Sequence, residues 1–140
     1  MKRITALLAF ATLILAGAGP CFAEMDIEFV SKERAKKLGM EIRLKGNGPD
    51  QFWVELEFKA EGELKDFDRV TLEIREGEKL LVGYAPLQPH PSTSGRVLVG
   101  FMADRAYLDK VTLRVVSGKP INYIGRELRV RDFVDLKKPR

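Results

Sequence analysis

The sequence predicts an all-β fold, an antiparallel Greek-key sandwich of about seven or eight strands with one short helix. Several segments alternate apolar and polar side chains with a period of two, which is the pattern of a strand with one buried face. Clusters of turn-forming residues separate these segments. One short segment has helical character, and no helices alternate with the strands. Together these observations favour a sandwich over an α/β architecture.

The clearest strand is expected over residues 51–59, where apolar side chains occupy every second position from Phe52 to Phe58. Further strands are expected at 70–74, 97–101, 111–115 and 128–130, with weaker patterns at 26–30, 40–44 and 80–84. Because the period in each segment is two, one face of each strand is expected to lie in the core and the other in solvent.

The helical candidate is Lys32–Leu38, with Ser31 as its N-cap and Gly39 as its left-handed stop. We expect it to form a single short helical connection between two strands. Turns are expected at 46–50, 76–78 and 117–120, and a loop that crosses between the sheets at 86–95. These signals divide the chain into short strands and fit a sandwich of hairpins and crossovers.

Two stretches of the chain, 58–77 and 101–118, share one pattern. Both read Phe-x-Ala-acid, a spacer, and then Asp-basic-Val-Thr-Leu-x-aliphatic-x-x-Gly. We expect two equivalent strand–corner–strand units, placed pseudo-symmetrically in a Greek key. With this arrangement the chain resembles the immunoglobulin-like and fibronectin type III sandwiches. The resemblance covers most of the chain as a pattern of strands, and it carries over no functional residues because such folds support many functions.

Residues 1–23 are predicted to be a secretory signal peptide. Lys2 and Arg3 precede an apolar run, which ends in small residues before a cleavage site after Ala23. The run is shorter than the roughly 20 residues that a transmembrane helix needs. We therefore expect an exported protein, either periplasmic or secreted, with no later segment that spans a membrane.

Cleavage would leave one domain, residues 24–140. Pro20 in front of Cys21 disfavours the alternative, a lipoprotein acylated on that cysteine. The signal contains two of the 24 basic residues and none of the 20 acidic ones, so the remaining net charge is +2. This charge gives no strong attraction to nucleic acid. A single cysteine excludes a disulfide scaffold and a cysteine-based zinc site.

The reactive side chains of this domain predict no catalysis, metal or cofactor. The only histidine, His90, lies between two prolines in the expected crossover loop. Carboxylates are frequent over 55–78, and we interpret them as solvated cross-strand ladders, so a small hydrolase is a less favoured alternative. Asp66 and Asp68 lie at a strand corner and leave a calcium-binding module open, although calcium takes about six to eight oxygen ligands.

Trp53 is the candidate ligand-binding residue. Alternation places it on the polar face of its strand, between Gln51 and Glu55. An exposed tryptophan there would suit a sugar ring or a protein partner. In the alternative interpretation, Trp53 covers the end of the sheet and packs under the 46–50 loop or against the 32–38 segment.

The sequence thus favours an exported, non-catalytic binding domain whose partner is a protein or a surface polymer such as a carbohydrate. For a protein partner, the segment 97–103 is the expected site of strand addition if it lies at a sheet edge. Leu98 and Met102 make this segment apolar on both sides. The alternative is a structural or assembly subunit that forms a homo-oligomer. The sequence leaves the ligand and the oligomeric state open.

Overall fold

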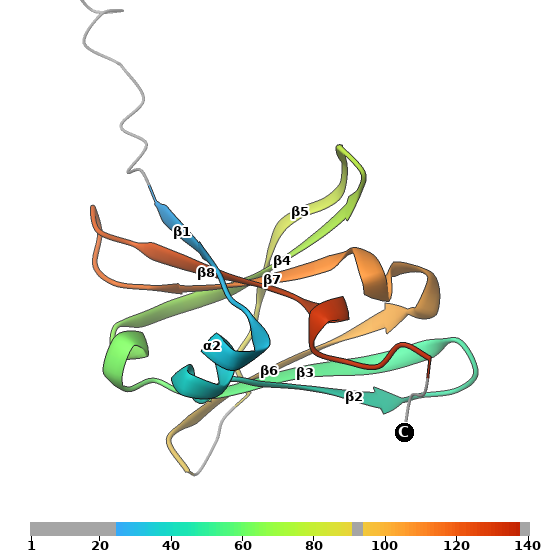
Figure 1. Cartoon of the computed structure of the whole chain (residues 1–140), viewed down its shortest axis with the longest axis horizontal. Coiled ribbons are helices and arrows are strands. Elements are labelled where there is room, and N and C mark those ends of the chain that lie inside the picture. Colours follow the sequence, from blue (N-terminus) through green and yellow to red (C-terminus); the bar gives the residue numbers. More distant parts are fainter. Residues whose placement is uncertain (1–24, 91–93, 138–140) are drawn as a thin grey trace, which may run out of the picture.

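The computed structural model describes residues 25–90 and 94–137, which form two β-sheets packed face to face (Figure 1). The larger sheet has the strand order β1-β8-β7-β4-β5, and the smaller sheet has the order β2-β3-β6. The strands are β1 (Asp26–Phe29), β2 (Glu41–Gly46), β3 (Gln51–Lys59), β4 (Phe67–Glu76), β5 (Lys79–Leu87), β6 (Arg96–Asp104), β7 (Val111–Ser117) and β8 (Ile124–Arg129). This architecture confirms the predicted all-β sandwich.

Short helices occupy the connections. They are α2 (Lys32–Leu38) and the 3₁₀ helices η1 (Gly62–Leu64), η2 (Arg105–Lys110) and η3 (Val130–Asp132). Within the residues that the structure describes, no helix has the length and apolar character needed to cross a membrane. The expected signal peptide, with Cys21, lies outside the described residues, as do residues 91–93 of the crossover loop.

The core lies between the two sheets and is built by the alternation seen in the sequence. β3 contributes Leu56 and Phe58 to it, and β7 contributes Leu113 and Val115 from the opposite sheet. All four side chains are fully buried. Burial of such a side chain contributes about 1.5–3 kcal/mol relative to exposure, so these inward faces supply most of the stability of the fold.

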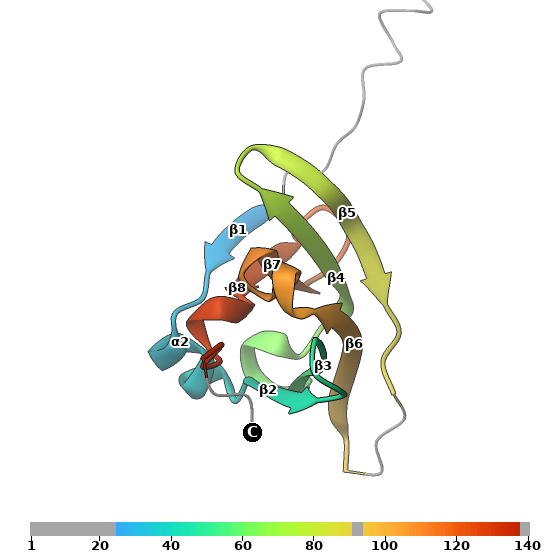
Figure 2. The same cartoon turned by 90° about the vertical axis from the view of Figure 1, so that its right-hand side faces the viewer.

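Helix α2 begins and ends where the sequence predicts. The side chain of Ser31 accepts a hydrogen bond from the backbone N–H of Arg34 at 3.2 Å. Gly39 ends the helix with φ at +68°, a conformation that glycine adopts without a Cβ clash. Ala35 is buried against the core. The helix thereby covers the side of the sandwich between β1 and β2 (Figure 2).

Two details differ from the sequence predictions. β1 pairs with β8 in parallel, so the larger sheet is not purely antiparallel. A period of two determines which face is buried but not which strands are neighbours, so the pattern alone could not reveal this pairing. The last strand is expected near 128–130, but β8 ends at Arg129. Val130 begins η3 instead, and its apolar side chain is buried there.

The repeated sequence pattern corresponds to a structural repeat. Each copy forms a strand of the smaller sheet, a 3₁₀ corner and a strand of the larger sheet, as β3–η1–β4 and β6–η2–β7. β3 pairs with β6 and β4 pairs with β7, both antiparallel. Each corner buries one leucine, Leu64 in η1 and Leu108 in η2. The two units therefore lie side by side in both sheets.

One charged side chain lies on an inward face of the sandwich. Arg126 on β8 shares that face with Leu128, and only 4% of its side chain is exposed. Its guanidinium donates hydrogen bonds to Glu28 at 3.0 Å, to the hydroxyl of Ser117 at 2.8 Å and to Glu63 at 3.2 Å. Burying an unpaired charge costs several kcal/mol, and these three acceptors offset that cost.

A second arginine extends this cluster onto the helix. Arg34 on α2 donates to Glu28 at 2.7 Å and to Glu63 at 2.5 Å. The hydrogen bond from Arg34 is the main reason why the pKa values of both carboxyls lie below their usual range. The cluster therefore fastens α2, β1 and η1 to β8.

We expect Arg126→Ala to lower the free energy of unfolding by about 2 kcal/mol, because it leaves a cavity and removes the donor that three acceptors share. Urea unfolding at neutral pH measures this loss. Arg129→Ala, which removes an exposed arginine from the same strand, is the control and should change stability by less than about 0.5 kcal/mol. Equal losses for the two variants would contradict a special role for the buried cluster.

Candidate functional site

Trp53 lies on the outward face of the smaller sheet, as the alternation predicts. It sits on β3 between Lys45 of β2 and Met102 of β6. It is half-buried, because its indole ring lies over Gly100, where an added Cβ would overlap the ring. The ring centroid is 6.2 Å from that of His90. One face of the indole therefore covers the sheet, and its role in ligand binding stays a prediction.

Two carboxylates near Trp53 on β3 form ion pairs with arginines. Glu55 accepts hydrogen bonds from the indole N–H at 3.2 Å and from Arg43 at 3.0 Å. Burial raises the pKa of Glu55, but these bonds outweigh burial and hold it below its usual value. Glu57 binds Arg96 at 2.7 Å and also Arg43, and both arginines lower its pKa. A general acid needs a raised pKa, so neither carboxyl suits that role at neutral pH.

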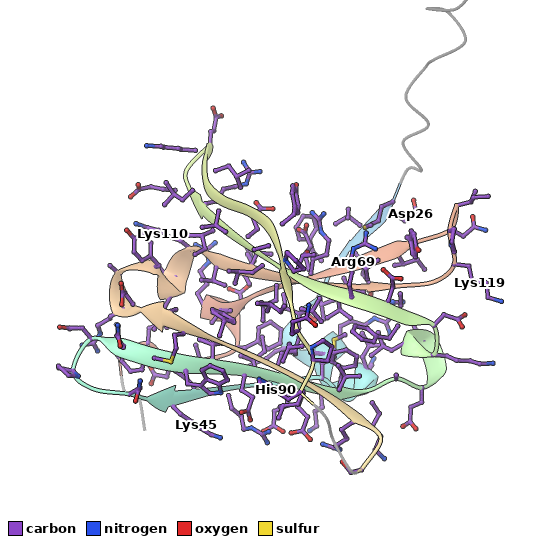
Figure 3. The ribbon with its side chains drawn as sticks, turned by 180° about the vertical axis from the view of Figure 1, so that it is seen from behind. Asp26, Lys45, Arg69, His90, Lys110 and Lys119 are labelled. Atoms are coloured by element: carbon purple, nitrogen blue, oxygen red, sulfur yellow. The ribbon has the colours of Figure 1, made fainter. Side chains whose placement is uncertain are left out.

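The structure also places the other residues that the sequence singled out. The backbone N–H of His90 donates to the carbonyl of Leu98 at 2.7 Å, which places His90 alongside β6 (Figure 3). The side chain of Asp68 pairs with Arg69, and the carbonyl of Asp66 accepts a bond from the backbone of the β7–β8 turn. Among residues 25–90 and 94–137, no three His, Cys, Asp or Glu side chains gather to hold a metal ion.

β6 lies at an edge of the smaller sheet, as strand addition requires. The other edge strands carry features that discourage pairing with another chain. β1 has four residues, β2 alternates charged side chains outward, and β5 contains Pro86 and bulges in its pairing with β4. β6 instead keeps nine residues in unbroken register with β3, and its charged residues are confined to its ends.

The backbone groups of β6 that face the free edge can be assigned. In an antiparallel strand, the N–H and C=O of one residue point to the same side, and this side alternates along the chain. The carbonyl of Leu98 points away from β3, because it accepts the bond from His90. The groups of Gly100 and Met102 therefore point to the same free side. Met102 is also 43% exposed, so this end of β6 presents both backbone and an apolar side chain.

Sequence reasoning missed the buried Arg126. A signal was present, because the period of two that places Leu128 in the core also places Arg126 there. Tyr84 and Tyr123 both stack against arginines on the outer face of the larger sheet, which only the strand pairing brings together.

Comparison of this chain with protein-family models, with curated proteins and with solved structures gave no match.

Replacing Gly100 by alanine should displace the indole of Trp53. We expect Gly100→Ala to lower the free energy of unfolding by about 1–3 kcal/mol through overpacking and to shift the fluorescence of this single tryptophan to longer wavelength. Gly46→Ala on β2 is the matched control, because nothing lies within 4 Å of its added Cβ. An unchanged spectrum for Gly100→Ala would contradict the packing of Trp53 on β6.

The paired carboxylates make stability depend on pH. Because the pKa of Glu57 in the folded chain lies below its ordinary value of 4.5, its contribution is complete above that pH and is lost as the pH falls further. We expect the stability difference between the wild type and Glu57→Gln to close below pH 4.5. Urea unfolding from pH 7 to pH 3 measures this difference, and a constant difference would contradict the assignment.

Proposed function

We propose that this protein is an exported, non-catalytic interaction domain that binds an extended segment of a protein partner along the edge of β6. The observation that carries the proposal is that β6 is a long, regular and apolar edge strand, whereas the other edges are short, charged or bulged. His90 covers this edge at Leu98, and native proteins rarely leave the remainder of such an edge without a partner. Export is expected from the signal peptide that the sequence predicts.

The free end of β6 is suited to strand addition. A partner strand would exchange backbone hydrogen bonds with Gly100 and Met102, which supply affinity independent of sequence. Its side chains would alternate between the two faces of the extended sheet. Those on the outward face would lie beside Met102 and Trp53, so this pair would select apolar partner side chains. The proposal thereby gives Trp53 a role at the rim of a protein interface.

The strand order supports the resemblance to immunoglobulin-like sandwiches. In those folds one sheet contains strands A, B and E and the other contains G, F, C and, in the variable type, C′. Here β2-β3-β6 follows the order A-B-E, and β8-β7-β4-β5 follows G-F-C-C′. Sandwiches of this kind are frequent among cell-surface domains, in agreement with an exported interaction module.

The alternative is a structural subunit that pairs with a second copy of itself through the same edge. Two antiparallel copies of β6 centred on Gly100 would place Arg96 of each copy opposite Asp104 of the other, which are opposite charges. This register would replace the bond between His90 and Leu98. A molecular mass that rises with concentration in sedimentation would favour this alternative.

Met102→Pro tests the proposed edge. Proline removes an N–H that faces the free side, where it is tolerated, and leaves the pairing with β3 intact. We expect at least a tenfold loss of captured partner from an envelope extract, since backbone pairing is blocked. Met102→Ala keeps the N–H and serves as control, with a small loss at most. Equal capture by the wild type and both variants would refute strand addition at β6.

A further inference from the structure

The outer face of the larger sheet carries a hollow of about 260 Å³. It is lined by Met25, Arg69, Thr71, Tyr84, Pro86, Arg114 and Val116, which we call the Arg–Tyr hollow. Arg69, which lies on β4, is labelled in Figure 3. The hollow is on the opposite sheet from Trp53 and β6, so it is separate from the edge proposed above. Drug-sized sites occupy about 300–1,000 Å³, so this volume suits one small ring.

The two arginines that line the hollow each stack on a tyrosine, and one of these tyrosines, Tyr84, also lines the hollow. The guanidinium of Arg114 lies over the ring of Tyr84, 4.7 Å from its centroid. The guanidinium of Arg69 lies over Tyr123 at 5.3 Å. The sheet brings these pairs together, because Arg69 of β4 is paired with Val116, two residues along β7 from Arg114. Each stack holds a planar group with several N–H donors in one orientation.

The two arginines differ in how firmly they are held. Arg114 donates through Nε to Glu127 at 3.0 Å, across the β7–β8 pairing, and both side chains are largely buried. Arg69 pairs only with its exposed neighbour Asp68 among the carboxylates that the structure describes. An exposed pair of adjacent residues contributes little and is easily exchanged. Arg69 is therefore the guanidinium that an incoming carboxylate could recruit.

Tyr84 is held in an uncommon backbone conformation. Its φ is +47°, a value that side chains other than glycine, asparagine and aspartate rarely adopt. It lies where the pairing of β4 with β5 shifts register between Leu72 and Ile74. The side chain is 49% exposed despite its stack on Arg114. A strained residue that presents a fixed aromatic ring toward solvent points to recognition.

We propose that the Arg–Tyr hollow binds an acidic sugar ring, such as the uronate residue of a surface polysaccharide. Its carboxylate would exchange with Asp68 on Arg69, as a planar guanidinium binds carboxylates in a fork. The apolar C–H face of the ring would lie against Tyr84 and Met25. Its hydroxyls would meet the donors of Arg114 and the hydroxyl of Thr71. The charge of Arg114 is already compensated by Glu127, so the hollow takes one negative charge.

The test is a titration of the ¹⁵N-labelled protein with sodium glucuronate, followed by amide chemical shifts. Shifts should appear at Arg69, Thr71 and Arg114, while the amide of Trp53 on the other sheet stays unchanged. Arg69→Gln should raise Kd at least tenfold by removing the carboxylate partner. Arg129→Gln removes an exposed arginine that also has a carboxylate neighbour, and it should bind as the wild type does.

Two further probes distinguish a uronate site from a site that recognises only the sugar ring or only the negative charge. Methyl glucoside has the ring without the charge, and benzoate has the charge on a flat ring without hydroxyls. Weaker binding of both than of glucuronate supports the proposal. It is overturned if glucuronate causes no shifts, if either probe binds equally well, or if Arg129→Gln weakens binding as much as Arg69→Gln. None of these outcomes affects the Met102→Pro test, so the two proposals fail independently.

Discussion

The structure depends on packing a five-stranded sheet against a three-stranded one. The inner faces must bury each other, yet the larger sheet is wider and its outer strands extend beyond the smaller sheet. On the side of β1, α2 covers the gap (Figure 2). The ion pairs of Arg34 and Arg126 hold the helix there. On the side of β5, the chain crosses to β6 and touches it through the His90 bridge. β6 is the last strand of the smaller sheet on this side.

The two sides of the sandwich differ in the chemistry found where the larger sheet extends beyond the smaller one. A buried guanidinium is expensive to desolvate, and Arg126 is acceptable because Glu28, Glu63 and Ser117 satisfy it. That solution fixes β1, η1, β7 and β8 in one arrangement. On the opposite side, the backbone groups of Gly100 and Met102 point to the free side of β6, an arrangement that would be unfavourable for an isolated edge and useful for recruiting a partner strand.

The repeated unit explains why both sheets have the same central pairing. The pair β3–β6 in the smaller sheet and the pair β4–β7 in the larger sheet form the centre of the sandwich. The remaining strands lie beside these pairs. The outward faces of this centre then differ by composition. On the smaller sheet, Glu55 and Glu57 bind arginines beside Trp53. On the larger sheet, arginines stack on tyrosines and leave a hollow. One framework thus presents two unlike surfaces.

The sequence alone determined the local features, because they depend on neighbours within a few residues. The period of two identified the strands and the outward position of Trp53, and the residues Ser31 and Gly39 set the ends of α2. Only the tertiary structure decided which strands are neighbours. The parallel β1–β8 pair, the packing of Trp53 on Gly100 and the meeting of Arg114 with Tyr84 all join residues distant in sequence. Such contacts result from how whole sheets bury their apolar faces, which no local pattern encodes.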